Sequence, residues 1–136
     1  MKPEPVLLIT GATGNLGSKL ARGLAKHNYY TVFVDQIPHP NLNVKTADLS
    51  SPGNWMQLFA GVDTVIHLAG TPKVNSSPDT LKTQNVDCTL NVLKACKMHN
   101  VSRVVFASSL HVMGGYRETG RRVTEDLPPK PSGNFG

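Results

Sequence analysis

Cysteine, aromatic residues and long apolar runs are all scarce in this sequence. Their scarcity argues against a disulfide, a nucleic-acid surface and a membrane-spanning segment, respectively. The only two cysteines, Cys88 and Cys96, fall in one predicted helix about 12 Å apart along its axis, too far for a disulfide. We interpret both as reduced thiols of a cytoplasmic protein, and we expect no metal site. Aromatic residues make up 6% of the chain, and no aromatic–basic interleaving suggests a nucleic-acid surface. No apolar run approaches the length that spans a membrane.

The distribution of charge along the chain indicates which kinds of partner to expect. The net charge is +5 over 136 residues, but the cations are scattered rather than clustered, so we expect neither a nucleic-acid nor a membrane partner. The densest group is Arg117, Arg121 and Arg122, which is typical of a solvated loop but could also attract a carboxylate substrate. The N-terminus lacks the apolar core of a signal peptide.

Strand-like and helix-like segments alternate along the chain, which predicts an α/β fold with a doubly wound parallel sheet. Five segments read as strands: Val6–Thr10, Tyr30–Val34, Leu42–Thr46, Thr64–Leu68 and Arg103–Ala107. Three read as helices: Ser18–His27, Asn54–Ala60 and Thr80–His99. We expect the long third helix to bury Leu81, Val86, Leu90 and Leu93. After Ser109 the periodicity stops, and we expect a loop.

The most informative motif is the glycine-rich run from Thr10 to Gly17. It follows a buried strand and precedes a helix, the order that a dinucleotide phosphate site requires. Gly11 allows a sharp turn, Gly14 lets backbone N–H groups approach a pyrophosphate, and Gly17 lets the helix pack closely. The helix N-terminus adds unpaired donors and partial positive charge. A tight strand–helix turn without a ligand is the alternative.

Asp35 follows the second predicted strand, 24 residues after Gly11. A carboxylate at that place accepts hydrogen bonds from the adenosine ribose hydroxyls and repels a 2′-phosphate. It therefore predicts NAD rather than NADP as the cofactor. The alternative is a carboxylate that caps a turn at the strand end.

Taken in order, these motifs resemble those of the extended short-chain dehydrogenases/reductases, the family of NAD-dependent sugar epimerases and dehydratases. The motifs that carry the resemblance are Thr10–Gly17, Asp35, Ala47–Leu49, His67–Gly70, Asn85 and Phe106–Ser109. Ser109–Gly114 is most similar to the uronate dehydrogenase branch. The resemblance implies a Rossmann-type sheet of about five strands. It covers essentially all of residues 1–136 but only the first half of such a protein, ending before the family's Tyr-x-x-x-Lys lysine and substrate region.

The resemblance also implies residue roles. Ser109 would hydrogen-bond the substrate, with His111 beside it as a further substrate contact. The cofactor contacts implied are Gly11, Thr13, Gly14, Asn15, Leu16, Gly17, Asp35, Asp48, Leu49, Leu68, Ala69 and Gly70. Asp48 and Leu49 would flank the adenine, and the last three would line the cofactor near its nicotinamide-side ribose. His67 lies mid-strand, and we interpret it as a hydrogen-bonded core histidine instead.

Two departures from the family pattern bear on activity. The family's catalytic base is a tyrosine, and the corresponding position holds Phe135, whose side chain has no hydroxyl to exchange a proton. Leu110 stands where the uronate dehydrogenase branch tends to carry a polar residue. We therefore expect an NAD-binding protein that acts, in a full-length form, on a sugar or sugar acid by hydride transfer. We expect this chain alone to be inactive, and it could form a homo-oligomer. A non-catalytic nucleotide-sensing or scaffold module is the alternative.

Overall fold

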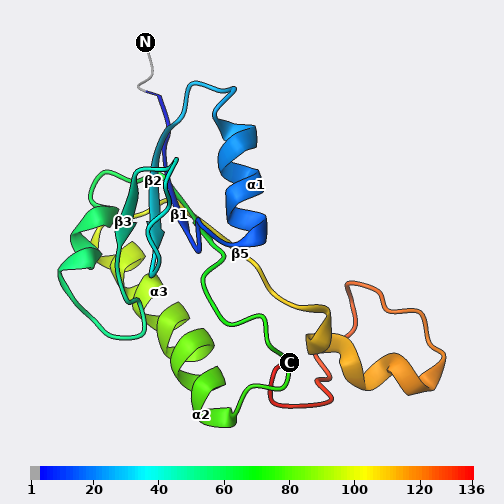
Figure 1. Cartoon of the computed structure of the whole chain (residues 1–136). Helices are drawn as coiled ribbons and strands as arrows, with labels where there is room; N and C mark the ends of the chain where they lie inside the picture. Colours follow the sequence, from blue (N-terminus) through cyan, green and yellow to red (C-terminus); the bar gives the residue numbers. More distant parts are fainter. Residues whose placement is uncertain (1–3) are drawn as a thin grey trace.

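A five-stranded parallel sheet forms the centre of the molecule (Figure 1). The computed structural model describes residues 4–136. The strand order is β3-β2-β1-β4-β5, so the chain reverses direction across the sheet after β3 and leaves the carboxyl ends of β1 and β4 side by side. The strands are β1 (Val6–Thr10), β2 (Tyr30–Asp35), β3 (Val44–Thr46), β4 (Thr64–His67) and β5 (Arg103–Phe106). The predicted parallel sheet is confirmed.

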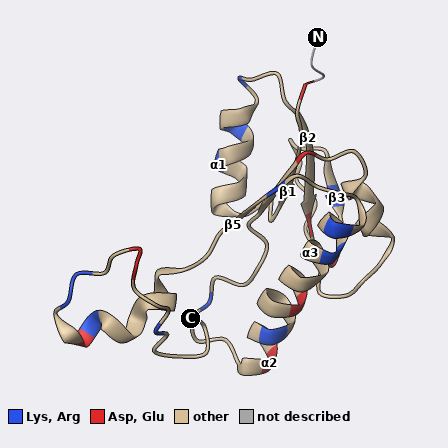
Figure 2. Ribbon diagram, turned by 180° about the vertical axis from the view of Figure 1, so that it is seen from behind, with Lys and Arg blue, Asp and Glu red and all other residues tan. Residues whose placement is uncertain are grey.

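Helices lie on both faces of this sheet, as Figures 1 and 2 show from opposite sides. Helix α1 (Asn15–Leu24) covers one face, while the 3₁₀ helix η1 (Asn54–Phe59) and helix α3 (Cys88–Met98) cover the other. Two short segments, α2 (Pro78–Leu81) and the π-helix η2 (Lys82–Asp87), lead into α3. Ser77 caps α2, because its side-chain oxygen accepts the N–H of Thr80 at 3.1 Å. This arrangement follows from right-handed crossovers between parallel strands.

The main core lies between the sheet and the α3 face. Leu8, Val65 and Val92 are fully buried there, with Phe59 of η1 packed against them. β1 is buried on both faces because it lies in the middle of the sheet, which explains its unbroken apolar run.

The buried side of the long third helix differs from the prediction. Leu81 is buried as expected, but Val86, Leu90 and Leu93 are 53%, 50% and 45% exposed. The π-helical turn η2 carries more residues per turn than an α-helix and so shifts the phase of everything after it. Residues on a different stripe therefore face the sheet: Cys88, Asn91, Val92, Ala95 and Cys96.

Smaller differences concern helix boundaries. Helix α1 begins at Asn15 rather than Ser18, because the glycine-rich turn itself forms the first helical turn. In η1 the buried residues are Met56 and Phe59, while Trp55 is partly buried against the core.

Residues 110–136, here called the arm, project from the body of the molecule (Figure 1). The sequence predicts a loop here, but the first part forms the 3₁₀ helix η3 (Leu110–Thr119). The returning segment folds back on it. The Lys130 N–H donates to the Val112 carbonyl at 2.9 Å, and the Tyr116 hydroxyl donates to the Pro128 carbonyl at 3.1 Å. The arm is therefore held mainly by its own backbone contacts.

Candidate functional site

The glycine-rich turn joins β1 to α1 and needs its glycines for distinct steric reasons. Gly11 has a φ of +69°, and a Cβ there would lie 2.8 Å from the backbone nitrogen of Ala69. A Cβ on Gly17 would collide with the Gly11 carbonyl oxygen. Around Gly14, by contrast, a Cβ would meet only the Gly11 carbonyl oxygen, at 3.3 Å. The turn is thus tight against the protein on one side and open on the other.

The N-terminus of α1 suits an anion. Its cap residue is Gly14, no side chain caps it, and the first turn of this helix carries no acidic residue. The first N–H groups of a helix have no partner within it, and they carry the positive end of the helix dipole. Together with the open side at Gly14, this end fits a pyrophosphate.

Asp35 is the last residue of β2 rather than the first after it. Its carboxylate lies across the glycine-rich turn, where Oδ2 accepts the Thr13 N–H at 2.9 Å. Oδ1 accepts the N–H groups of Gln36 at 2.7 Å and Ile37 at 3.3 Å. Asp35 therefore caps its own turn, which was the alternative interpretation, and its side chain also lines a pocket. Its Oδ2 keeps acceptor capacity for a further hydrogen bond.

These residues line a pocket of about 450 Å³, here called the glycine-side pocket. It contains eleven of the twelve predicted cofactor contacts, namely Gly11, Thr13, Gly14, Asn15, Leu16, Gly17, Asp35, Leu49, Leu68, Ala69 and Gly70. Other lining residues were not predicted: Gln36, Ile37, Ala47, Ser50, Pro72, Gln84 and Cys88. Gln36 and Ile37 follow Asp35 directly, so their position in the chain could have identified them.

Asp48 is the predicted cofactor contact that does not line this pocket. Its Oδ1 accepts the N–H of Ser50 at 2.9 Å and the Nε2–H of Gln36 at 3.3 Å. Hydrogen bonds from Ser50, with a smaller contribution from Gln36, lower the pKa of its carboxyl despite slight desolvation. In the structure Asp48 positions Gln36, which itself lines the pocket.

A second pocket, of about 620 Å³, lies between the sheet edge and the arm and is here called the serine-side pocket. Ser109, His111 and Phe135 all line this pocket. They bring a hydroxyl, an imidazole and an apolar ring to the same place. The Ser109 oxygen accepts the His111 N–H at 3.1 Å, which leaves the hydroxyl hydrogen free to donate. The rings of His111 and Phe135 meet edge-to-face at 5.4 Å. Phe135 thus faces the pocket without offering a polar atom.

The two pockets share a wall made by Leu68, Ala69, Gly70 and Pro72, the segment that follows β4. Asn85 of η2 holds this segment at two points. Its Oδ1 accepts the Thr71 N–H at 2.7 Å, and its Nδ2 donates to the Thr71 carbonyl at 3.3 Å. A ligand that fills one pocket can therefore extend directly to the other.

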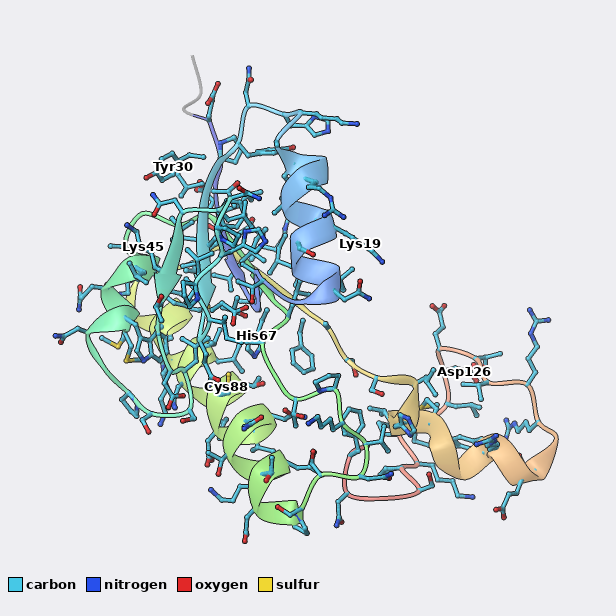
Figure 3. All side chains as sticks on the ribbon, in the orientation of Figure 1. Lys19, Tyr30, Lys45, His67, Cys88 and Asp126 are labelled. Carbon is cyan, nitrogen blue, oxygen red and sulfur yellow. The ribbon has the colours of Figure 1, made fainter. Side chains whose placement is uncertain are left out.

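His67 supports this wall from beneath and is the buried core histidine that the sequence predicts (Figure 3). Its Nδ1 lies 2.7 Å from the Thr10 hydroxyl and its Nε2 lies 3.0 Å from the Thr89 hydroxyl. Burial lowers the pKa of its ring to about 4, so the ring is neutral at physiological pH.

Both cysteines are free, as predicted, and the structure places both in buried positions. Cys88 lines the glycine-side pocket, but burial, aided by the nearby Asp48 charge, raises the pKa of its thiol to about 11. A thiol that stays protonated is a poor nucleophile, so Cys88 contributes shape rather than chemistry. Among the described residues, no helix is long and apolar enough to cross a membrane.

Comparison with known proteins places this geometry in a family. The family model described as "NAD dependent epimerase/dehydratase family" matches residues 7–136. A uronate dehydrogenase of Pseudomonas putida is 32% identical, and the match covers 96% of this chain and 50% of that protein. The chain therefore spans about half the length of the curated relatives it matches.

Solved structures with a similar fold include proteins of the same kind. MoeE5 in complex with UDP-glucose and NAD superposes with a TM-score of 0.85 at 34% identity, covering 96% of this chain and 44% of that one. A uronate dehydrogenase from Agrobacterium tumefaciens was solved as a tyrosine-to-alanine mutant complexed with NAD. It gives a TM-score of 0.82 at 31% identity, covering 96% of this chain and 50% of that one.

NAD, predicted from Asp35, is the cofactor that the family description names and that both of these structures contain. The chain belongs to the NAD dependent epimerase/dehydratase family, which confirms the resemblance found in its motifs.

Proposed function

We propose that this chain binds NAD in the glycine-side pocket. The N-terminus of α1 would hold the pyrophosphate, and the Asp35 carboxylate would accept hydrogen bonds from the adenosine ribose. Leu68, Ala69 and Gly70 would line the nicotinamide half at the wall between the pockets. When bound, NAD supplies a hydride acceptor; the residues of the chain supply its position.

We further propose that the serine-side pocket receives a sugar or sugar acid. The observation that carries this proposal is the shared wall. It would place the nicotinamide half of NAD in the glycine-side pocket next to a sugar in the serine-side pocket. Ser109 has a hydroxyl hydrogen available for a substrate oxygen, and His111 adds a ring nitrogen in the same pocket. The relatives' names, which include uronate dehydrogenases and UDP-sugar epimerases, support this class of substrate.

In the full-length form the reaction would be hydride transfer from a sugar carbon to NAD. Such a transfer needs a base to take the hydroxyl proton. Phe135 stands at the place where the family pattern has its tyrosine, and it cannot act as that base. This chain alone would therefore bind both partners and turn them over poorly or not at all.

Phe135 also favours a second candidate, a module that binds the nucleotide without catalysis. The two candidates differ in what the serine-side pocket does. An enzyme places a substrate there beside the nicotinamide, whereas a nucleotide-sensing or scaffold module needs only the glycine-side pocket.

One titration separates these candidates. The fluorescence of NADH is followed as the chain is added, and then galacturonate, glucuronate or UDP-glucose is added to the complex. We expect NADH to bind and at least one sugar to change its signal. Binding of NADH with no response to any sugar favours the non-catalytic module, and no binding of NADH contradicts both.

A further inference from the structure

A chain of hydrogen bonds runs beneath the wall between the two pockets, from β1 through β4 to α3. Thr10 ends β1, His67 ends β4, and Thr89 lies in the first turn of α3. The three side chains touch in series, with distances of 2.7 Å and 3.0 Å on the two sides of the His67 ring. The ring also stacks on Phe106 of β5, at a centroid distance of 5.8 Å.

The direction of the first hydrogen bond follows from what Thr10 already accepts. Its hydroxyl oxygen accepts the N–H groups of Leu68 and Ala69, each at 3.2 Å, and Leu68 shares its hydrogen with the Thr10 carbonyl. A hydroxyl oxygen has two lone pairs and one hydrogen. With both lone pairs engaged, Thr10 can approach a ring nitrogen at 2.7 Å only by donating its hydrogen.

His67 Nδ1 is therefore the acceptor of this bond and carries no hydrogen. Burial keeps the ring neutral, and a neutral imidazole carries its single hydrogen on one nitrogen. That hydrogen lies on Nε2, which donates to the Thr89 oxygen. Because Thr89 accepts here, its own hydroxyl hydrogen is left for another acceptor.

No acceptor for that hydrogen occurs among the hydrogen bonds of residues 4–136. The usual acceptor for a helical threonine is the carbonyl four residues back, here that of Asn85, and the described residues show no such bond. Thr89 does line the serine-side pocket, half-buried next to the shared wall. We propose that the Thr89 hydroxyl is a hydrogen-bond donor to an oxygen of the ligand in that pocket.

This inference rests on the proposed function for the identity of the ligand, which is a sugar or sugar acid. Hydroxyl, carbonyl and carboxylate oxygens are the acceptors such a molecule offers. Thr89 lies in α3 and Ser109 caps the N-terminus of η3, so they would bind it from two directions. His67 acts here as a positioning residue, because it sets the direction of the Thr89 hydroxyl without touching the ligand.

The first test needs no ligand. Nitrogen NMR of the chain labelled in its histidine rings reports which nitrogen of His67 carries the hydrogen. We expect the hydrogen on Nε2 and a bare Nδ1. A hydrogen on Nδ1 would overturn the inference, because Thr89 would then have to donate its hydrogen to Nε2 and would have none for a ligand.

The second test compares Thr89→Val, which keeps the shape and loses the hydroxyl, with Thr89→Ser, which keeps the hydroxyl. Galacturonate and UDP-glucose are titrated into each variant saturated with NADH. We expect affinity for the bound sugar to fall about tenfold in Thr89→Val and to stay near the parental value in Thr89→Ser. NAD affinity should stay within about twofold in both, since Thr89 does not line the glycine-side pocket.

Equal sugar affinity in the parent chain and Thr89→Val would overturn the inference. A loss of NAD affinity in Thr89→Val that equals its loss of sugar affinity would also overturn it, because that pattern indicates general damage to the fold. A parent chain that binds NAD and no sugar contradicts the proposed substrate pocket instead. In that case the ring tautomer still decides whether Thr89 presents a donor.

Discussion

At the scale of single residues, we propose that Asp35 sets the preference of the chain for NAD over NADP. Its carboxylate faces the glycine-side pocket and would meet the 2′-phosphate of NADP with like charge. We expect the parent chain to bind NAD more tightly than NADP. Asp35→Ala should remove that preference and weaken NAD about tenfold, since a charge-assisted hydrogen bond is lost.

Calorimetric titration of both nucleotides into both proteins measures this difference. Asp126→Ala is a suitable control, because Asp126 is exposed on the arm and lines neither pocket. Equal affinity of the parent chain for NAD and NADP would refute the role of Asp35.

His67 makes folding stability depend on pH. Its ring has a pKa of about 4 in the folded chain, against an ordinary value of 6.5 that we take for the unfolded chain. Between these values the unfolded state binds more protons, so the free energy of unfolding falls as the pH falls from about 6.5 to about 4. The full loss is about 3 kcal/mol, and stability from this source is complete above about pH 6.5.

Urea unfolding of the parent chain and of His67→Gln at a series of pH values checks this prediction. The variant should be less stable at neutral pH and should lose less stability on acidification. His27→Gln provides the matched control, because it makes the same substitution at an exposed position. Identical slopes in the parent chain and His67→Gln would show that another group titrates instead.

At the scale of elements, the junction of β1 and α1 depends on close backbone packing. A Cβ on Gly17 would press into the Gly11 carbonyl, whereas a Cβ on Gly23 of the same helix would meet nothing within 4 Å. Gly17→Ala should therefore destabilise the chain by about 1–3 kcal/mol and weaken NAD binding, because the helix must move away from the turn.

Gly23→Ala should raise stability by about 0.5–1 kcal/mol, because alanine is the better helix former. Both values come from urea unfolding followed by circular dichroism. A Gly17→Ala chain as stable as Gly23→Ala would show that the turn has more room than its backbone contacts indicate.

The elements also show what the sequence could and could not predict. The strand β1 and the glycine-rich turn have local sequence signals, an apolar run and a glycine spacing, that are sufficient to identify them. The buried stripe of α3 is not local, because the π-helical turn η2 shifts its phase. An α-helical period applied through Lys82–Asp87 places Leu90 inward, whereas the structure places it outward. The sequence predicts a loop in the arm but not the helix η3, because this segment has little apolar periodicity and is held by backbone hydrogen bonds.

At the scale of the whole molecule, the glycine-side pocket was predicted better than the serine-side pocket. Its residues lie at the ends of successive parallel strands, which all open on the same edge of the sheet. Ser109 and His111 were found through the resemblance. The sequence does not identify Thr89. Its role depends on the hydrogen bond between His67 Nε2 and the Thr89 oxygen, which only the structure shows.

The composition of the serine-side pocket predicts binding without turnover. Because Phe135 lines this pocket without a group that can take a proton, we expect no NADH to appear when this chain is mixed with NAD and either galacturonate or glucuronate. The ultraviolet absorbance of NADH, followed for hours at high protein concentration, measures this. Steady formation of NADH above the rate without protein would show that another group in the pocket serves as the base.

The most direct test of the central claim is a calorimetric titration of NAD into the chain of residues 1–136. The geometry of the glycine-rich turn, the α1 N-terminus and Asp35 predicts saturable binding of one NAD per chain, lost when Gly14 is replaced by a bulky residue such as valine. The absence of saturable binding by a chain shown to be folded would contradict the claim that this site holds a dinucleotide.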